Sequence, residues 1–224
     1  MRILIIGLLA LQLCTWSAEA VAGEAPRARQ APVVDGIPDD EAWNQGDWVE
    51  LQYSIIGTNP TSEDFSGRYK VVWTPDFLYV LAEITDDVLV DSTANPLKSY
   101  WNDDTLEFFV DEDASGGNHH KNDSAYAYHV ALDNQVVDIG PDGEPALYPT
   151  HVVAAWKRDL AHPHRIYWEA RIAVYAEGAD TARKLTENET LGFMLAYCDA
   201  DTANGRDHFF GDVEIDPVNG DRNR

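Results

Sequence analysis

The sequence has few basic residues, few cysteines and one long apolar run. Its 224 residues include 16 lysines and arginines against 39 aspartates and glutamates, so the formal net charge is -23 at pH 7. A negative field of this size repels nucleic-acid phosphates and anionic lipid surfaces, and we therefore expect no nucleic-acid partner. It suits neutral ligands, and it suits cations such as calcium.

The apolar run lies at the N-terminus and has the pattern of a secretory signal peptide. Arg2 precedes an apolar stretch over residues 3–13, and Ala18-Glu19-Ala20 is a small-x-small cleavage signal. We therefore predict that residues 1–20 are a signal peptide and that the protein is exported, to the periplasm or the medium. Cleavage would leave Cys198 as the sole cysteine, which excludes an internal disulfide.

Two other readings of this N-terminus compete with cleavage. The apolar run could anchor the chain in a membrane, but it is too short to span a bilayer. Cys14 could carry lipid, although the preceding Leu13 is bulky where lipid attachment wants a small residue. No second long apolar segment follows, so we expect no membrane association after cleavage.

Beyond a polar leader at residues 21–32, the patterns are those of strands. Apolar residues alternate with others in several short runs, and turn residues separate these runs. The clearest alternating sets are Tyr69, Val71 and Trp73; Leu106, Phe108 and Val110; Tyr126, Tyr128 and Val130; Ile166, Trp168, Ala170, Ile172 and Val174; and Phe193, Leu195 and Tyr197. Helical periodicity is confined to a short turn near residues 38–43. We therefore predict an all-β fold over residues 33–224: a two-sheet β-sandwich, jelly-roll or immunoglobulin-like, with about ten strands and one short helical turn.

Several motifs occur in an order that is familiar from a known family. The motifs are Val33–Trp43, Tyr69–Val80, Trp101–Asp111, Tyr167–Ile172, Leu191–Phe193 and Asp199–Asp201. Together they resemble family 9 carbohydrate-binding modules, which belong to the DOMON-like β-sandwich superfamily. The resemblance implies an exported, non-catalytic module that stacks a mono-, oligo- or polysaccharide between aromatic side chains. Such modules accompany glycoside hydrolases, which makes a hydrolase a further expected partner in polysaccharide breakdown.

The resemblance also suggests which residues contact the sugar. Trp101 would be one aromatic wall, although a tryptophan at the end of a loop can equally plug a core. Strand alternation turns Glu107 away from its neighbours Leu106 and Phe108, toward solvent or a site, and the resemblance implies that it bonds sugar hydroxyls. The alternative for Glu107 is an ordinary solvent-facing position. His129, the third expected sugar contact, stands where better-known members have an arginine that bonds the sugar, and histidine is shorter but can still bond a hydroxyl.

The second aromatic wall of the family comes late in the chain. The corresponding region here is Arg206–Asp212, and we predict Phe210 as the wall with Phe209 turned to the core. Asn204 and Asp207 would supply hydrogen bonds to the edge of the sugar. The chain ends in a turn-like sequence where family members usually add a strand, so we expect the final strand of the family to be missing.

A polar loop is the first choice for the structural calcium that the resemblance implies. Asp111, Asp113, Asn118 and Asp123 offer hard oxygen ligands, of which calcium takes six to eight. The spacing does not match an EF-hand, and a solvated acidic loop is the competing interpretation. The loop therefore predicts a calcium site that calorimetry or melting experiments can test.

Two other functions remain open at the level of sequence. Glycoside hydrolysis needs only two carboxylates, and this chain has many, so their number is not informative. A haem-binding electron-transfer domain is the second alternative, since the superfamily includes such domains and Met194 offers a possible axial ligand. Packing in the core is the simpler role for Met194.

Overall fold

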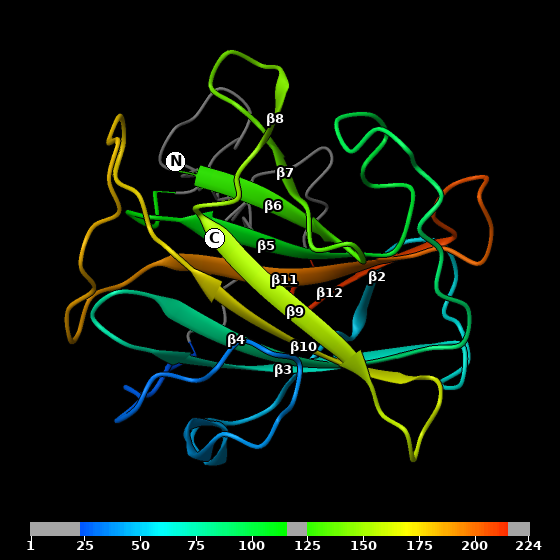
Figure 1. The fold of residues 1–224 in the computed structure, drawn as a ribbon, viewed down its shortest axis with the longest axis horizontal. Coiled ribbons are helices and arrows are strands. Elements are labelled where there is room, and N and C mark those ends of the chain that lie inside the picture. Colours follow the sequence, from blue (N-terminus) through cyan, green and yellow to red (C-terminus); the bar gives the residue numbers. More distant parts are fainter. Residues whose placement is uncertain (1–22, 116–124, 215–224) are drawn as a thin grey trace, which may run out of the picture.

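The computed structural model describes residues 23–115 and 125–214 of the chain. These residues form two antiparallel sheets packed face to face, with one short 3-10 helix, η1 (Glu41–Asn44). Figure 1 shows the two layers one above the other, with loops at both ends of the sandwich. The predicted all-β sandwich with one helical turn is confirmed.

The first sheet has five strands in the order β1-β3-β4-β10-β9. Its central strands are long and pair over their full length, with Val80 opposite Ala170 between β4 and β10. The bounds are β1 (Val49–Glu50), β3 (Phe65–Trp73), β4 (Leu78–Asp86), β10 (Arg165–Ile172) and β9 (Val152–Arg158).

The second sheet has seven strands in the order β2-β12-β11-β5-β6-β7-β8. Strand β5 lies at its centre, between β11 and β6, and the short strands lie toward the two edges. The bounds are β2 (Tyr53–Ile56), β12 (His208–Gly211), β11 (Gly192–Asp199), β5 (Thr105–Asp111), β6 (Ala125–Ala131), β7 (Val136–Ile139) and β8 (Pro145–Leu147).

The main core lies between the sheets and is built from the predicted alternating sets. Successive side chains of a strand point to opposite faces, so every second residue of β5 and β10 can enter the same core. Trp168 of β10 and Phe108 of β5 are completely buried there. At about 25 cal/mol per Å² of apolar surface, this burial is the chief stabilising contribution to the fold.

A buried glutamate ties the N-terminal motif to the five-stranded sheet. Glu169 of β10 is fully buried and points away from the main core. Its carboxylate accepts hydrogen bonds from the backbone N–H groups of Asp35 and Gly36, at 3.0 and 2.9 Å, and from Trp43 Nε1 at 2.7 Å. Gly36 has φ +78°, and an added Cβ would lie 2.6 Å from the backbone of Trp156, so this turn requires glycine.

The described ranges 23–115 and 125–214 contain twelve strands, where the sequence predicted about ten. The segment 138–149 contains the end of β7 and all of β8, which the predicted alternating sets did not include. The sequences of strands β2 and β12 also lack a clear alternating pattern. Among the described residues, no helix has the length and apolar character needed to cross a membrane.

Candidate functional site

Trp101 lies in the long loop between β4 and β5, at the right-hand end of the sandwich in Figure 1. Its side chain is 40% exposed, and it is the sole aromatic residue among the exposed large hydrophobic residues of the described chain. Tryptophan usually buries most of its surface, so exposure of this ring on a folded loop is informative. Its location agrees with the predicted exposure, while its contact with sugar stays a prediction.

The loop that carries Trp101 is fastened at its base. Asp103 is buried and accepts hydrogen bonds from the backbone N–H groups of Ser92 and Thr93, at 2.9 and 2.7 Å, and from the Ser92 hydroxyl at 2.8 Å. Burial raises the pKa of Asp103, but these hydrogen bonds lower it more, and the net shift is downward. Asp103 therefore stays ionised and fixes the loop that presents Trp101.

Behind this loop, Glu107 and His129 form a buried ion pair across β5 and β6. The two residues are register partners, and His129 Nε2 lies 2.9 Å from Glu107 Oε1. His129 Nδ1 lies 2.9 Å from the carbonyl oxygen of Ala127. A carboxylate and a carbonyl can only accept hydrogen bonds, so both ring nitrogens must donate and the imidazole is cationic.

The pKa values of the pair agree with this geometry. Burial raises the pKa of Glu107, but the charges of His129 and Arg206 lower it more, so it lies below the usual 4.5. Burial lowers the pKa of His129, but Glu107 raises it more, so it lies above the usual 6.5. The sequence placed Glu107 on the correct face, away from Leu106 and Phe108, yet only 2% of the residue is exposed.

Two further residues, which the sequence analysis missed, complete this cluster. Arg206 Nη1 lies 3.8 Å from Glu107 Oε1 and 3.0 Å from Cys198 Sγ, and its guanidinium stacks 4.6 Å above the Phe209 ring. The Cys198 thiol donates a hydrogen bond to Glu107 Oε1 at 2.9 Å. An arginine therefore does lie beside Glu107, but it comes from the β11–β12 loop and not from β6.

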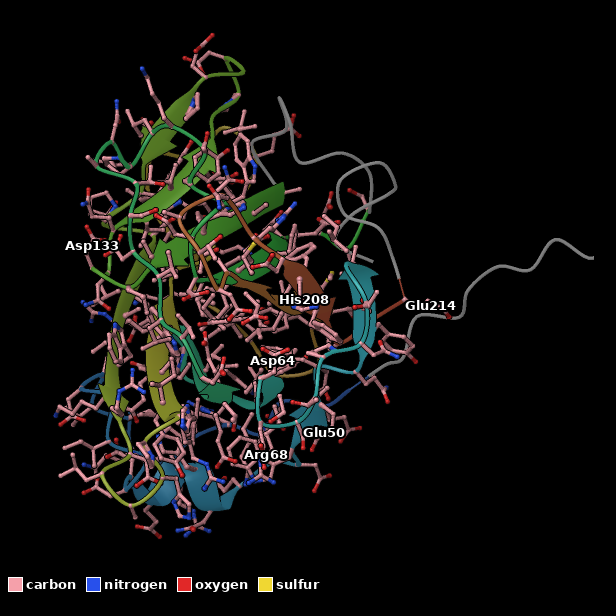
Figure 2. The ribbon with its side chains drawn as sticks, turned by 90° about the vertical axis from the view of Figure 1, so that its right-hand side faces the viewer. Glu50, Asp64, Arg68, Asp133, His208 and Glu214 are labelled. Atoms are coloured by element: carbon pink, nitrogen blue, oxygen red, sulfur yellow. The ribbon has the colours of Figure 1, made fainter. Side chains whose placement is uncertain are left out.

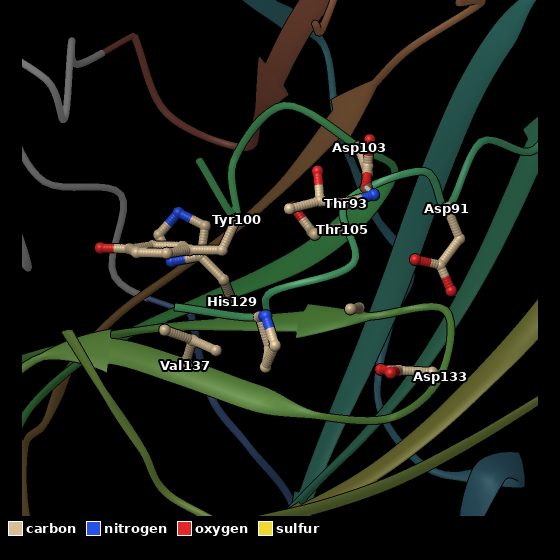
Figure 3. Close-up of a pocket in the computed structure, with 10 residues that line it drawn as sticks. Asp91, Thr93, Tyr100, Asp103, Thr105, His129, Asp133 and Val137 are labelled. Carbon is tan, nitrogen blue, oxygen red and sulfur yellow. Dashed lines mark hydrogen bonds between the residues drawn. The ribbon is translucent and has the colours of Figure 1, made fainter. Parts of the chain in front are cut away.

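Tyr100 is buried and packs against both Trp101 and His129. Its ring contacts the edge of His129 at 4.7 Å and the edge of Trp101 at 4.9 Å between ring centroids. Figure 3 shows Tyr100 beside His129 at one side of a small cavity that extends toward Asp91 and Asp133. This cavity has a volume of about 30 Å³, which is enough for about one water molecule and too small for a sugar ring.

The predicted edge residues lie on the neighbouring β11–β12 loop. Asn204 and Asp207 are exposed, and Asp207 accepts a hydrogen bond from the backbone N–H of Asp201 at 2.9 Å. An added Cβ on Gly205 would lie 3.3 Å from Asn102 Oδ1, so this loop contacts the Trp101 loop directly. The two loops thus form one continuous surface that contains Trp101 and Asn204.

The orientation of the phenylalanine pair is the reverse of the prediction. Phe210 is 6% exposed and lies in the main core, where its ring packs 4.8 Å from Phe65. Phe209 instead belongs to an apolar cluster on the outer face of the seven-stranded sheet, under Arg206. Because a one-residue shift in a strand exchanges its two faces, the alternation could not be assigned correctly from an uncertain register. Phe210 is therefore not an exposed aromatic wall.

Three buried carboxylates meet next to this surface, at the ends of three strands. Asp86, Asp104 and Asp199 are each no more than 1% exposed, and their carboxylate oxygens lie within 4.8 Å of one another. Burial raises the pKa of Asp86 to about 7, of Asp104 to about 9 and of Asp199 to about 6. Figure 2 looks on this end of the molecule, with His208 and Asp64 near its centre.

The donor set of this cluster fits a calcium ion. Calcium binds oxygen at about 2.3–2.6 Å, so two oxygens that share one ion lie at most about 5 Å apart. Among the described side chains, His208 forms an ion pair with one of these carboxylates, Asp199, at 3.0 Å. The raised pKa values show that ionising all three carboxylates is costly in this buried site, and a divalent cation would balance the charge of the ionised groups.

The acidic loop predicted from the sequence is only partly described. Asp111 is fully buried at the end of β5, and Asp113 is exposed and accepts a hydrogen bond from the backbone N–H of Ser115. Asn118 and Asp123 lie outside the described residues, as does the predicted signal peptide. The calcium site in this loop therefore stays a prediction, and the buried cluster is a second candidate.

Together, the two-sheet sandwich, the exposed aromatic on a fixed loop and the adjoining polar loop define a β-sandwich binding module. Residues 34–221 match the family described as carbohydrate family 9 binding domain-like, and the chain belongs to this family. The match covers most of the chain and confirms the resemblance drawn from the motifs.

The chain is also similar to parts of larger enzymes. It is 31% identical over 121 residues to endo-1,4-beta-xylanase A of Thermotoga maritima, covering 54% of this chain and 11% of that enzyme. It is 34% identical over 104 residues to endo-1,4-beta-xylanase A of Thermoanaerobacterium saccharolyticum, covering 46% of this chain and 8% of that enzyme. The matching region is thus about a tenth of the length of these xylanases.

Solved structures have the same fold. A family 9 carbohydrate-binding module from Caldicellulosiruptor kristjanssonii, in complex with glucose, superposes with a TM-score of 0.64 at 23% identity. The comparison covers 84% of this chain and 83% of that module. The complex of a module from the same organism with cellotriose gives a TM-score of 0.60 at 23% identity, covering 84% and 82%. At this identity the likeness establishes the architecture.

Proposed function

We propose that this protein is an exported, non-catalytic module that binds a neutral β-linked saccharide on the surface around Trp101. The single observation that carries the proposal is the exposed ring of Trp101, held on a loop that Asp103 fastens from below. The apolar face of a sugar ring suits such an aromatic surface, and neighbouring polar groups bond its hydroxyls. Asn102 and Asn204 lie on the two contacting loops that border this ring.

The chemistry of the saccharide follows from charge and from the relatives. The net charge of -23 disfavours acidic polysaccharides and favours uncharged chains. The relatives include xylanases and an exoglucanase, and two structural neighbours were solved with glucose and with cellotriose. We therefore propose gluco- or xylo-oligosaccharides as ligands and a glycoside hydrolase as the functional partner.

Two carboxylates that follow Trp101 in the chain, Asp103 and Glu107, are engaged in structural contacts, which supports a binding role. Hydrolysis of a glycosidic bond requires two carboxyl groups on either side of that bond. Asp103 uses both oxygens to fasten the loop, and Glu107 is buried in contact with His129, Cys198 and Arg206. Met194, the ligand considered for haem, is 2% exposed in the apolar cluster with Phe209 and packs there as a core side chain.

A structural calcium ion in the buried cluster is part of the proposal. Asp86, Asp104 and Asp199 would hold it, and the ion would supply positive charge that stabilises the base of both loops around Trp101. The Trp101 loop joins Asp86 to Asp104, and the β11–β12 loop starts directly after Asp199. Calcium would therefore act on sugar binding through the position of these loops.

The test measures binding of gluco- and xylo-oligosaccharides by titration calorimetry, with Trp101→Ala and Leu97→Ala as paired variants. Leu97 is 37% exposed on the same loop and serves as the matched control. We expect Trp101→Ala to weaken binding at this surface beyond detection, while Leu97→Ala binds as the unaltered protein does. Binding that survives at full affinity in Trp101→Ala would show that this surface is not the site, and no binding by the unaltered protein would refute the function.

A further inference from the structure

An open cavity lies at the opposite end of the sandwich from Trp101. It has a volume of about 360 Å³ and is bordered by residues of β6, the β8–β9 connection and the chain after β10. Figure 1 shows the last of these segments at the left, while the Trp101 loop is at the right. The lining residues with aromatic or polar side chains include Tyr126, Tyr148, Thr150, His151, Tyr175 and Asp180.

Four aromatic rings form the wall of this cavity in a fixed arrangement. The rings of His151 and Tyr175 stack at 3.8 Å between centroids, with 13° between their planes. Tyr148 contacts the edge of His151 at 4.8 Å, and Tyr126 contacts it at 5.3 Å. Tyr148 and Tyr175 remain half-buried, so they have surface to offer a ligand. The cluster thus presents ring faces and edges that do not depend on a ligand for their position.

The orientation and charge of His151 are also fixed. Its Nδ1 lies 2.7 Å from the hydroxyl oxygen of Tyr128, which is 1% exposed. Burial lowers the pKa of His151 to about 4, although Asp138 acts in the opposite direction, so the ring is neutral at pH 7. A neutral ring that accepts from Tyr128 at Nδ1 carries its hydrogen on Nε2, which can then donate.

We propose that this cavity is a second carbohydrate subsite, which takes one sugar ring of a neutral saccharide chain. The aromatic rings cover the CH-rich face of the sugar, and the hydroxyls of Thr150 and Tyr148 and the carboxylate of Asp180 bond its hydroxyl edge. These groups include both donors and acceptors, as a polyhydroxylated ring requires. An anionic ligand is disfavoured here by Asp180 and by the net charge of -23.

The size of the cavity and its position both favour this occupant. A volume of about 360 Å³ lies within the roughly 300–1,000 Å³ typical of small-ligand sites, in contrast to about 30 Å³ beside His129. Two subsites at opposite ends would let one module hold two chains, or two segments of one chain, of a polysaccharide and so raise its avidity.

This inference rests on the proposed function for the class of ligand but concerns different residues, so one experiment separates them. Cellotriose and xylotriose are titrated into the full protein by calorimetry, and backbone amide shifts are followed by NMR. The variants are Trp101→Ala, Tyr175→Ala and Ala179→Trp, the last of which fills the cavity without removing a packed ring. Ala161→Trp, in the exposed β9–β10 turn, is the matched control for an added tryptophan.

We expect a trisaccharide to shift the amides of Thr150 and His151, and to do so in Trp101→Ala as well. Tyr175→Ala and Ala179→Trp should each weaken this second binding at least tenfold, and Ala161→Trp should leave it unchanged. If Trp101→Ala loses all binding and Ala179→Trp leaves binding unchanged, the second subsite is overturned and the proposed function remains intact. Binding that Ala179→Trp removes and Trp101→Ala retains at full strength would support the cavity and refute the Trp101 site. If neither trisaccharide binds the unaltered protein, both are refuted.

Discussion

His129 Nε2 lies 2.9 Å from Glu107 Oε1, and both side chains are withdrawn from solvent between β5, β6 and Tyr100. An exposed glutamate was the simplest expectation from strand alternation, yet here the carboxylate balances a buried imidazolium. The pair is therefore a buried structural element next to the candidate site, and contact of Glu107 or His129 with a sugar stays a prediction.

Breaking this pair should destabilise the fold. Removing one partner of a buried ion pair typically costs about 3–5 kcal/mol, because the other charge is left without compensation. We expect Glu107→Gln to lower the free energy of unfolding by about 3 kcal/mol, measured by urea denaturation. The matched control is Glu83→Gln. Glu83 forms an ion pair with Arg68 at 3.0 Å, and the side chain of Arg68 is 37% exposed. Such a pair is worth about 1 kcal/mol or less, and equal losses in both variants would contradict the buried role of Glu107.

The same pair predicts a pH window of greatest stabilisation. The pKa of His129 is raised in the fold, so its contribution is complete below about 6.5 and is lost as pH rises through the folded value. The pKa of Glu107 is lowered, so its contribution is complete above about 4.5 and is lost as pH falls through the folded value. The difference in unfolding free energy between the unaltered protein and His129→Gln should therefore be greatest between these limits. A difference that stays constant from pH 4 to pH 9 would show that His129 is not charged.

Most of the fold could be predicted because its long strands bury one face. The series Ile166, Trp168, Ala170 and Ile172 alternates over the whole of β10, and that periodicity alone distinguishes a strand from a helix. Strands β7 and β8 have four and three residues, too few for a pattern to emerge. Asp138 also disrupts the expected alternation, because it is fully buried and its carboxylate accepts a hydrogen bond from the Ala127 backbone N–H.

The candidate site could be predicted only where its residues share a strand or a motif. Glu107 and His129 were identified together because they occupy neighbouring strands of a recognisable family. Arg206 and Tyr100 were missed because they reach the pair from loops, whose geometry follows from tertiary contacts and not from local periodicity. The buried Asp86, Asp104 and Asp199 were missed as a set for a related reason, since only the topology brings three strand ends together.

Removal of calcium should lower the melting temperature through the buried cluster. A ligand at a hundred times its dissociation constant stabilises the native state by roughly 2.7 kcal/mol. For a chain of this size that corresponds to roughly 5–10 °C between calcium and chelator. Asp104→Asn should reduce this difference by at least half, because it removes a central carboxylate of the cluster.

The control variant for the calcium experiment lies in the acidic loop that the sequence predicted as the calcium site. Asp113→Asn changes an exposed aspartate of that loop, so the calcium-dependent shift should persist if the ion is in the buried cluster. Loss of the shift in Asp113→Asn, with retention in Asp104→Asn, would place the ion in the loop. Identical melting temperatures in calcium and chelator for the unaltered protein would contradict both sites.

Glu169 provides the last test, which concerns the link between the N-terminal motif and the sandwich. Its carboxylate accepts two backbone hydrogen bonds from Asp35 and Gly36 and one from Trp43 Nε1, all at 3.0 Å or less. Glutamine cannot satisfy three donors with the same geometry, because its amide group offers one acceptor oxygen and presents N–H groups at the other position. We expect Glu169→Gln to cost about 2–3 kcal/mol of unfolding free energy, as a buried donor left unsatisfied does.

The control for Glu169 is a second carboxylate that binds the same segment at the surface. Asp40 accepts a hydrogen bond from the Val33 backbone N–H at 2.8 Å in an exposed position. Asp40→Asn should therefore cost well under 1 kcal/mol, because water can replace the lost interaction. Emission from Trp43 should shift to longer wavelength in Glu169→Gln if the motif detaches, as its ring is 5% exposed in the native fold. Since Glu169 lies on the five-stranded sheet, away from Trp101, saccharide affinity should be retained under conditions where the variant is folded. If Asp40→Asn and Glu169→Gln each lost saccharide affinity in proportion to their loss of stability, the N-terminal motif would instead contribute to the sugar site.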